Sequence, residues 1–178
     1  IGMSALQTSE YFGTGNASKA LGSAHPRNAP YQGFAAKDGY FAVAAGNDKL
    51  WAGLCKLLDL AELIDDARFT TQLLRATNQK VLANILGAVF ISETVEYWMA
   101  AIDEHGIPCA PVNDFPTILN SEQVKQLGLV ETINLPNGCE TRTTTFPVRI
   151  DGQVPKLRRL PPKLGEHTEE VLRDWVKS

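Results

Sequence analysis

The sequence is short of cysteine, since its 178 residues include only three. Cys55, Cys109 and Cys139 are far apart and form no CxxC pair or His/Cys cluster, which leaves a zinc site or a disulfide framework without support. Free cysteines in apolar or strand-like surroundings are more often small buried hydrophobic side chains. We therefore expect three buried thiols in a reducing cytoplasm, and no bound metal.

Long apolar runs and concentrated basic segments are also missing. No stretch approaches the roughly 20 apolar residues of a membrane span, and no basic-then-apolar leader opens the sequence. The formal net charge is −3, and lysines and arginines gather in no one segment, whereas phosphate binding needs a concentrated basic face. We expect neither a membrane nor a nucleic acid as a partner.

The composition that remains is ordinary for a globular protein, with 44% hydrophobic and 21% charged residues in a chain long enough for one core. The pattern predicts an α+β fold, in which short antiparallel strands surround a helical middle and extended connectors lie at both ends. The predicted strands are Tyr31–Ala36, Tyr40–Ala45, Glu131–Leu135 and Cys139–Thr145, the first pair turning at Lys37-Asp38-Gly39 and the second at a type I′ turn in Pro136-Asn137-Gly138.

Helices are predicted from apolar residues at helical spacing and from their end signals. They are expected at Ile1–Tyr11, after the cap Asn47, after the cap Asn78, from near Ser92 to Gly106, at Phe115–Asn120, at Glu122–Leu127 and after the cap Thr168. We expect three parts: a connector helix and loop (1–30), a small α+β domain (31–146), and an extended arm with a short C-terminal helix (147–178). Trp51, Trp98 and Trp175 are interpreted as core residues.

No established catalytic motif is present, since the sequence contains no GxSxG, P-loop, GxGxxG or HExxH pattern. His105 falls in the last turn of a predicted helix, where a partial positive charge suits the dipole, and His167 lies beside a helix start. His25 lies in the loop from Gly22 to Pro30. Its small neighbours leave backbone N–H groups accessible, so this loop either approaches an anionic or thioester group closely or is a flexible connector.

Six different segments of the chain are informative when they are taken together and in order. They are Gly22–Tyr31, Lys37–Ala44, Gly46–Trp51, Asp65–Phe69, Gly106–Val112 and Pro161–Leu172. Each segment alone is a weak signal, but the ordered set covers nearly the whole chain and resembles the family III CoA-transferases, the group that includes formyl-CoA and carnitine CoA-transferases. Two segments depart from the family pattern, with Ala67 at a usual proline and Ala110 at a usual glycine.

The resemblance implies a homodimeric enzyme that moves coenzyme A between carboxylic acids, with an acyl-CoA and a carboxylic acid as substrates and no permanently bound cofactor. Members of the family use an aspartate of a large Rossmann-like domain, which forms a mixed anhydride and then an aspartyl-CoA thioester. The match covers the small domain and its connectors. The catalytic aspartate is therefore expected upstream of this chain, which begins at Ile1, and the chain alone is expected to be inactive.

The resemblance also implies an active site between the large domain of one subunit and the small domain of the other, covered in some members by a glycine-rich loop. The matching residues are Gly22, Ser23, Ala24 and His25, which are expected to contact the CoA thioester. This loop is poor in glycine, which argues against a mobile lid and leaves a role in shielding the intermediate from water.

Two alternatives stay open. In α-methylacyl-CoA racemases of the same superfamily a glutamate lies near the start of the helix after the apolar strand, and the matching position here is Asn47, which is no acid or base. The other alternative is a non-catalytic module that binds CoA esters or a partner protein. The acid specificity is expected to come mostly from the large domain, so oxalate, succinate, carnitine-type and aromatic acids are all left open.

Overall fold

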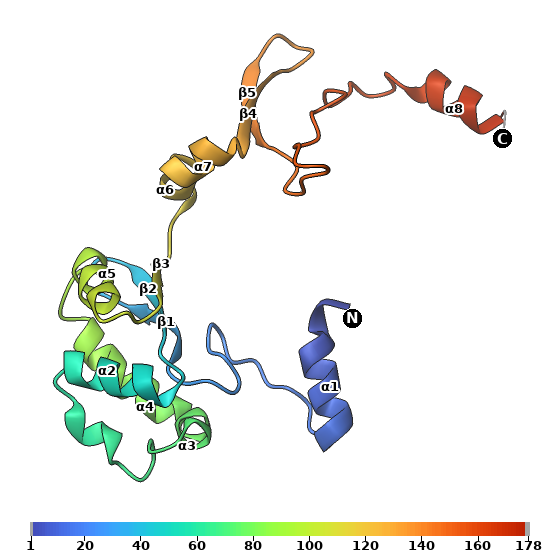
Figure 1. Cartoon of the computed structure of the whole chain (residues 1–178). Coiled ribbons are helices and arrows are strands. Elements are labelled where there is room, and N and C mark those ends of the chain that lie inside the picture. The colour runs from blue at the N-terminus through green and yellow to red at the C-terminus, as the bar shows by residue number, and fades with distance from the viewer. Residues whose placement is uncertain (1, 177–178) are drawn as a thin grey trace. The chain divides into compact units, whose positions relative to one another are not determined.

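A computed structural model describes residues 2–176, in which the chain divides after Val112 into a first unit and a second unit (Figure 1). The first unit contains an antiparallel sheet of order β1-β2-β3, made of β1 (Tyr31–Ala35), β2 (Tyr40–Ala44) and β3 (Cys109–Pro111). The predicted first hairpin is thus confirmed, and its turn is tied to the unit because Val95 N–H donates to the carboxylate of Asp38.

The helices of the first unit follow the predicted pattern with two exceptions. They are η1 (Gly2–Ser4), α1 (Ala5–Thr14), α2 (Asp48–Leu57), η2 (Ala61–Ile64), α3 (Gln72–Thr77), α4 (Gln79–Phe90) and α5 (Val95–Glu104). The two exceptions are η2 and α3, which the sequence analysis did not predict. Asn78 is the N-cap residue of α4 as predicted, but its side chain makes no hydrogen bond to that helix and donates instead to the carbonyls of Arg68 and Leu74.

Helix α5 begins later than predicted. Thr94 is its N-cap, and the Thr94 hydroxyl accepts from Tyr97 N–H, so the helix starts at Val95 rather than near Ser92. Asn47 caps α2 as predicted, since its side chain accepts from Leu50 N–H at 2.9 Å. A side-chain acceptor at this position satisfies one of the N–H groups that a helix start leaves without a partner.

The core of the first unit lies between the sheet and helices α2, α4 and α5, which gather beside the strands in Figure 1. Its centre is Phe90, whose ring lies 4.9 Å from Phe34, 5.0 Å from Phe41 and 5.2 Å from Trp98, measured between centroids. The Trp98 indole N–H donates to the Phe90 carbonyl at 2.7 Å, so this large side chain is buried without losing its hydrogen bond.

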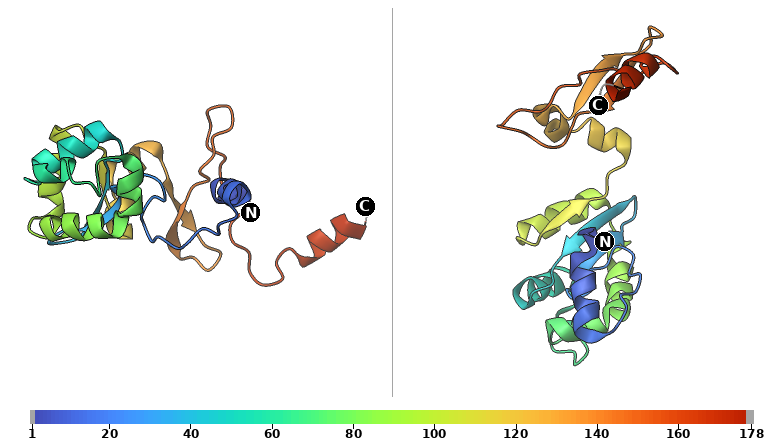
Figure 2. Two further views of the ribbon diagram at one scale, coloured as in Figure 1. Left: turned by 90° about the horizontal axis from the view of Figure 1, so that it is seen from below. Right: turned by 90° about the vertical axis from the view of Figure 1, so that its right-hand side faces the viewer.

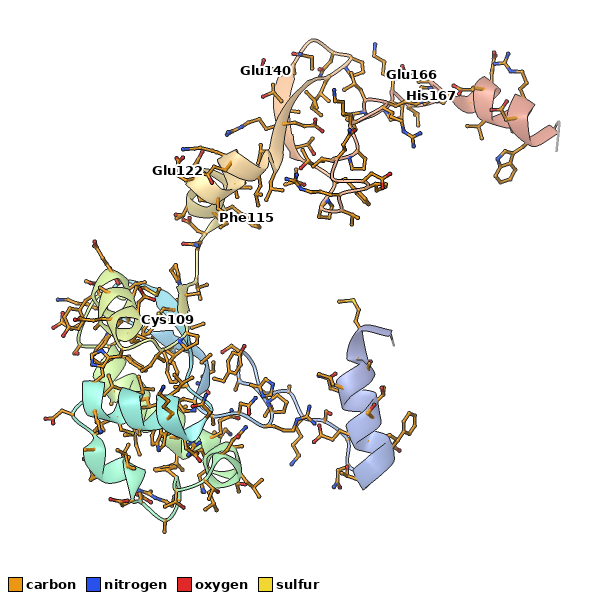
Figure 3. The ribbon with its side chains drawn as sticks, viewed as in Figure 1. Cys109, Phe115, Glu122, Glu140, Glu166 and His167 are labelled. Atoms are coloured by element: carbon orange, nitrogen blue, oxygen red, sulfur yellow. The ribbon has the colours of Figure 1, made fainter. Side chains whose placement is uncertain are left out.

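The second unit contains short helices, one hairpin and a long irregular segment (Figure 2). Its elements are α6 (Phe115–Leu119), α7 (Glu122–Leu127), β4 (Val130–Asn134), β5 (Glu140–Thr144) and α8 (Thr168–Val176). Asp114 and Ser121 cap the first two helices with side-chain hydrogen bonds. Figure 3 shows Glu166 and His167 in the turn that leads into α8.

The turn between β4 and β5 differs from the predicted type I′. The Leu135 carbonyl accepts from Gly138 N–H at 2.9 Å, and Leu135 N–H donates to Cys139 at 2.8 Å, which makes Pro136 and Asn137 the central residues. Of these turn residues only Gly138 has a positive φ, of 83°. The proline ring fixes φ near −65°, so Pro136 selects a type I turn that ends in a left-handed glycine.

Two groups of side chains expected in the core are not all buried. Trp51 and Trp98 are buried, but Trp175 in α8 is 77% exposed. Among the cysteines Cys55 is buried, Cys109 in β3 (Figure 3) is half-buried, and Cys139 next to the hairpin turn is exposed. The expectation therefore fails for Cys139 and for Trp175, both in the second unit, because the elements around them are too short to cover them.

The ends of the chain carry two further outcomes. The predicted N-terminal helix is confirmed as η1 and α1, although Ile1 lies outside the described residues, and none of its described residues is buried. In residues 2–176 no single helix has the length and apolar character to cross a membrane, and α4 with α5 would reach that length only across a bend of 111°. The expected boundaries between connector, small domain and C-terminal arm, at residues 30 and 146, stay predictions.

Candidate functional site

The candidate site is the loop from Gly22 to His25, which follows an extended segment and precedes β1. Gly22 opens a turn in which Ala24 N–H donates to the Leu21 carbonyl at 3.2 Å. Its φ of +63° lies in the left-handed region, where a Cβ would clash with the backbone, so this turn needs glycine. Gly22 and Ser23 are exposed, whereas Ala24 and His25 are half-buried.

Ser23 ties the turn to the sheet. Its hydroxyl accepts from Gly33 N–H in β1 at 3.1 Å. A Cβ on Gly33 would lie 3.4 Å from the same hydroxyl oxygen, an ordinary van der Waals contact, so the loop packs directly against the strand. The turn and the first strand therefore form one packed feature.

His25 is fixed on three sides. Its backbone N–H donates to the Tyr31 carbonyl at 2.9 Å, and its ring stacks on the Tyr31 ring with centroids 5.3 Å apart and planes 13° apart. Ring atom Nδ1 accepts from the backbone N–H groups of Arg27 and Asn28, each at 3.1 Å. By accepting these two hydrogen bonds, the ring stabilises the turn that follows His25, as an asparagine or aspartate side chain does in other turns.

Helices α3 and α4 hold the loop from outside. Gln79 Nε2 donates to the His25 carbonyl at 2.9 Å, Arg75 Nε donates to the Ala29 carbonyl at 3.0 Å, and Gln72 Nε2 donates to the side-chain oxygen of Asn28. Gln72 and Arg75 are three residues apart in α3 and lie on one face of that helix, whereas Gln79 is the first residue of α4. We call Gln72, Arg75 and Gln79 the clamp.

Arg75 is the centre of this arrangement and is fully buried. Besides the Ala29 carbonyl, its guanidinium donates to the carbonyls of Phe69 and Gly46, both at 3.0 Å, and to the carboxylate of Asp48 at 2.6 Å. It also lies over the Trp51 ring, 5.6 Å from the centroid. A buried arginine is tolerable only with such partners, and the planar fork lets one side chain hold several segments at once.

Two hollows border the loop. One of about 390 Å³ is lined by Ala24 and Pro26 of the loop together with residues of α1. A second of about 610 Å³ is lined by Pro26 and Arg27 together with residues of α3. Both hollows are bordered by Pro26 and by Glu10 of α1, whereas Gly22, Ser23 and His25 line neither of them.

The remaining candidate groups have structural roles. His105 is the C-cap of α5, with Nδ1 2.8 Å from the Ala101 carbonyl, and His167 lies 3.9 Å from the carboxylate of Glu170. The carboxylate of Asp66 accepts from Arg68, and these hydrogen bonds lower the pKa of Asp66 to about 2. Within residues 2–176, no three His, Cys, Asp or Glu side chains gather closely enough to hold a metal ion.

Sequence reasoning identified the loop but missed the residues that hold it. Gln79 lies 54 residues after His25, and Arg75 lies 46 residues after Ala29. Their spacing gave no helical signal, because Gln72 and Arg75 belong to α3 and Gln79 belongs to α4. Asn47, which lies at the position compared with the racemase glutamate, is the N-cap of α2.

The model of CoA-transferase family III matches residues 1–168 of this chain. Among curated proteins, the succinyl-CoA:glutarate CoA-transferase of Mus musculus is 37% identical over 159 residues, which is 89% of this chain and 36% of that protein. The succinate–glutarate CoA-transferase of Agrobacterium fabrum is 26% identical over 170 residues, which is 96% of this chain and 42% of that protein.

Among solved structures, a CAIB/BAIF family protein from Brucella suis superposes with a TM-score of 0.73 at 32% sequence identity. The match covers 97% of this chain and 44% of the Brucella protein. The chain therefore spans well under half the length of these relatives, and it shares the α+β fold of the portion that it matches.

Proposed function

Because the chain belongs to CoA-transferase family III, we propose that it is the portion of a CoA-transferase that faces an acyl-CoA thioester with Gly22, Ser23, Ala24 and His25. The observation that carries this proposal is the family match over residues 1–168, which includes the whole loop and both elements that hold it. The hollows beside Ala24, Pro26 and Arg27 give a ligand room next to the loop, and the clamp keeps the loop in place.

The proposed reaction moves coenzyme A between two carboxylic acids through an aspartate. The aspartate carboxylate attacks the thioester carbon, the C–S bond breaks, and CoA leaves as a thiolate with a mixed anhydride remaining. The thiolate then attacks the aspartyl carbon, releasing the first acid and forming an aspartyl-CoA thioester. The acceptor acid repeats the two steps in reverse order, which transfers CoA to it and frees the aspartate.

The catalytic aspartate is proposed to lie upstream of this chain. The relatives are more than twice as long as the matched portion, and several aspartates within it already have structural partners. Asp38 accepts from a helix N-terminus, Asp48 from buried Arg75, and Asp114 caps α6. On this proposal residues 1–30 and 147–178 connect to the missing domain, and the chain alone is inactive.

The proposed partners are an acyl-CoA, a carboxylic acid and a second copy of the complete chain. By their names, the relatives act on succinyl-CoA, succinate and glutarate, so succinyl-CoA with glutarate is the first pair to assay. No cofactor is proposed beyond the CoA ester itself. Free Cys55, Cys109 and Cys139 suit a reducing compartment, and the proposed site of action is the cytoplasm.

The test is an intact-mass measurement after incubation with succinyl-CoA and borohydride, on this chain and on the protein expressed with its upstream in-frame coding sequence. Borohydride reduces an aspartyl-CoA thioester to an alcohol, which lowers the mass at one residue. We expect the shift in the longer protein only. A shift within residues 1–178 would put the nucleophile inside this chain, and no shift or CoA transfer in either protein would overturn the proposed reaction.

A further inference from the structure

The geometry of the loop points to a specific donor atom. We infer that His25 is held as the neutral tautomer with its proton on Nε2, and that it presents this N–H to an oxygen of the acyl group. The inference rests on the proposed function for the identity of the ligand. The tautomer itself follows from contacts within the first unit.

The tautomer is set by the two hydrogen bonds at the other ring nitrogen. Backbone N–H groups of Arg27 and Asn28 both point at Nδ1, at 3.1 Å, so this atom must offer a lone pair and cannot carry a proton. A neutral imidazole with an unprotonated Nδ1 carries its proton on Nε2. The ring is therefore a donor at Nε2, with no hydrogen-bond partner for that atom among residues 2–176.

The direction of the donor is set by the surroundings of the ring. Stacking on Tyr31 fixes the plane of the imidazole, and the two Nδ1 contacts fix its rotation within that plane. The backbone on either side is held as well, since His25 N–H donates to Tyr31 and the His25 carbonyl accepts from Gln79. A donor held in this way need not reorganise when its acceptor develops charge.

An oxygen acceptor is the ligand that such a group recognises. In CoA transfer between acids, negative charge collects on the acyl oxygen whenever a carboxylate or thiolate attacks the carbonyl carbon. The ring is half-buried, so part of it is open to solvent, and its chain neighbours Ala24 and Pro26 line a hollow of about 390 Å³ that a ligand could enter. We assign His25 the role of donor to that oxygen, and Gln79 the role of positioning residue.

The first arm of the test concerns the tautomer, in this 178-residue chain. Long-range proton–nitrogen correlation spectra of the histidine rings distinguish a protonated Nε2 from a protonated Nδ1. The expected result is one protonated Nε2 signal for His25, which Gln79→Met broadens or averages. A protonated Nδ1 in the unmodified chain would overturn the inference whatever the enzyme does.

The second arm concerns catalysis, in the protein expressed with its upstream coding sequence. His25→Asn is the informative variant, because an asparagine side-chain oxygen can accept the Arg27 and Asn28 N–H groups as Nδ1 does, but has no donor at the place of Nε2. We expect kcat for succinyl-CoA:glutarate transfer to fall about 10²-fold, the usual cost of one oxyanion donor, with KM changed little. His25→Ala removes both functions and should also loosen the loop.

Two controls separate the outcomes. His105→Asn makes the same substitution at the C-cap of α5, outside the loop, and should leave the transfer rate unchanged. Gln79→Met should lower kcat about 10-fold through misplacement of the ring. Unchanged turnover in active His25→Asn protein would overturn the assigned role. An unmodified protein without transferase activity would overturn the proposed function instead, and the ring spectra would still decide the tautomer.

Discussion

The two units bury their apolar side chains to very different extents. Among the hydrophobic side chains that the structure describes, the buried ones all belong to the first unit except Val124. The second unit leaves large apolar groups exposed, including Phe115, Leu164 and Trp175. Hydrophobic burial is the main favourable contribution to folding, so the first unit contains its own stabilisation, whereas the second relies on caps and one hairpin.

The contrast shows which part of the chain positions the candidate site. The loop, the clamp and the sheet all belong to the first unit, and they are joined by hydrogen bonds to a buried arginine. We expect two unfolding transitions in denaturant, with the second unit losing its structure first.

The largest expected difference between the units is in thiol reactivity. Burial raises the pKa of Cys55 to about 12, and only the thiolate reacts, whereas Cys139 is exposed. Cys55 should therefore react only after the first unit opens. Its reaction should be at least about 10³-fold slower than that of Cys139, because folded molecules of a small domain outnumber unfolded ones by a factor of that order or larger. Peptide mapping after timed labelling with an alkylating reagent measures both rates.

Labelling in concentrated urea is the control for this experiment. There both thiols are exposed and their rates should converge. Equal rates in the native protein would contradict the contrast, because they would show that the core of the first unit opens as readily as the hairpin of the second.

A pair of matched phenylalanines gives the next largest effect. Phe90 is fully buried against three aromatic rings, while Phe115 at the start of α6 is 80% exposed (Figure 3). Phe90→Ala should lower the free energy of unfolding by about 3–5 kcal/mol, and Phe115→Ala should change it by less than about 0.5 kcal/mol. Urea unfolding followed by circular dichroism checks both, and Phe90→Leu provides a milder variant if the alanine variant does not fold.

Two arginines extend the comparison to charged groups. Arg75→Met in the first unit leaves the carbonyls of Ala29, Phe69 and Gly46 without their donor, at a cost of about 3 kcal/mol. Arg159 in the second unit pairs with Glu170 at the surface, and Arg159→Met should leave the unfolding transition of the first unit unchanged. Equal shifts from the two substitutions would show that Arg75 does not hold the loop.

The sequence predicted the hairpins and most helices because their signals are local. The cap Asn47 and the apolar spacing of α4 act within a few residues, and both are found in the structure. Helix α3 was missed because it is only six residues long and its buried face is an arginine, which composition favours on a surface. Pro136 was given too little weight beside the Asn137-Gly138 pair that favours a type I′ turn.

The candidate site was predictable only in part. The composition of the loop marked Gly22 to His25 as a place where a ligand could approach, and that role stays a prediction. The clamp could not be read in advance, since Gln79 and His25 meet across 54 residues of sequence. A hydrogen bond at such a separation depends on how whole elements pack, and it produces no periodic pattern of residues in the sequence.

The smallest expected effect is the acid sensitivity of one surface ion pair in the first unit. Hydrogen bonds from Arg68 lower the pKa of Asp66 from 3.8 to about 2, so the folded state favours the charged carboxylate. A depressed folded pKa gives stability that is fully present above 3.8 and is lost as the pH falls toward about 2. The first-unit urea midpoint of the unmodified chain should therefore exceed that of Asp66→Asn at neutral pH, and the two should converge between those values. Asp65 lies next to Asp66, and no hydrogen bond of its side chain is shown among residues 2–176, so Asp65→Asn should give no such convergence. A difference in urea midpoint between the unmodified chain and Asp66→Asn that persisted at pH 2 would mean that Asp66 acts through something other than its charge.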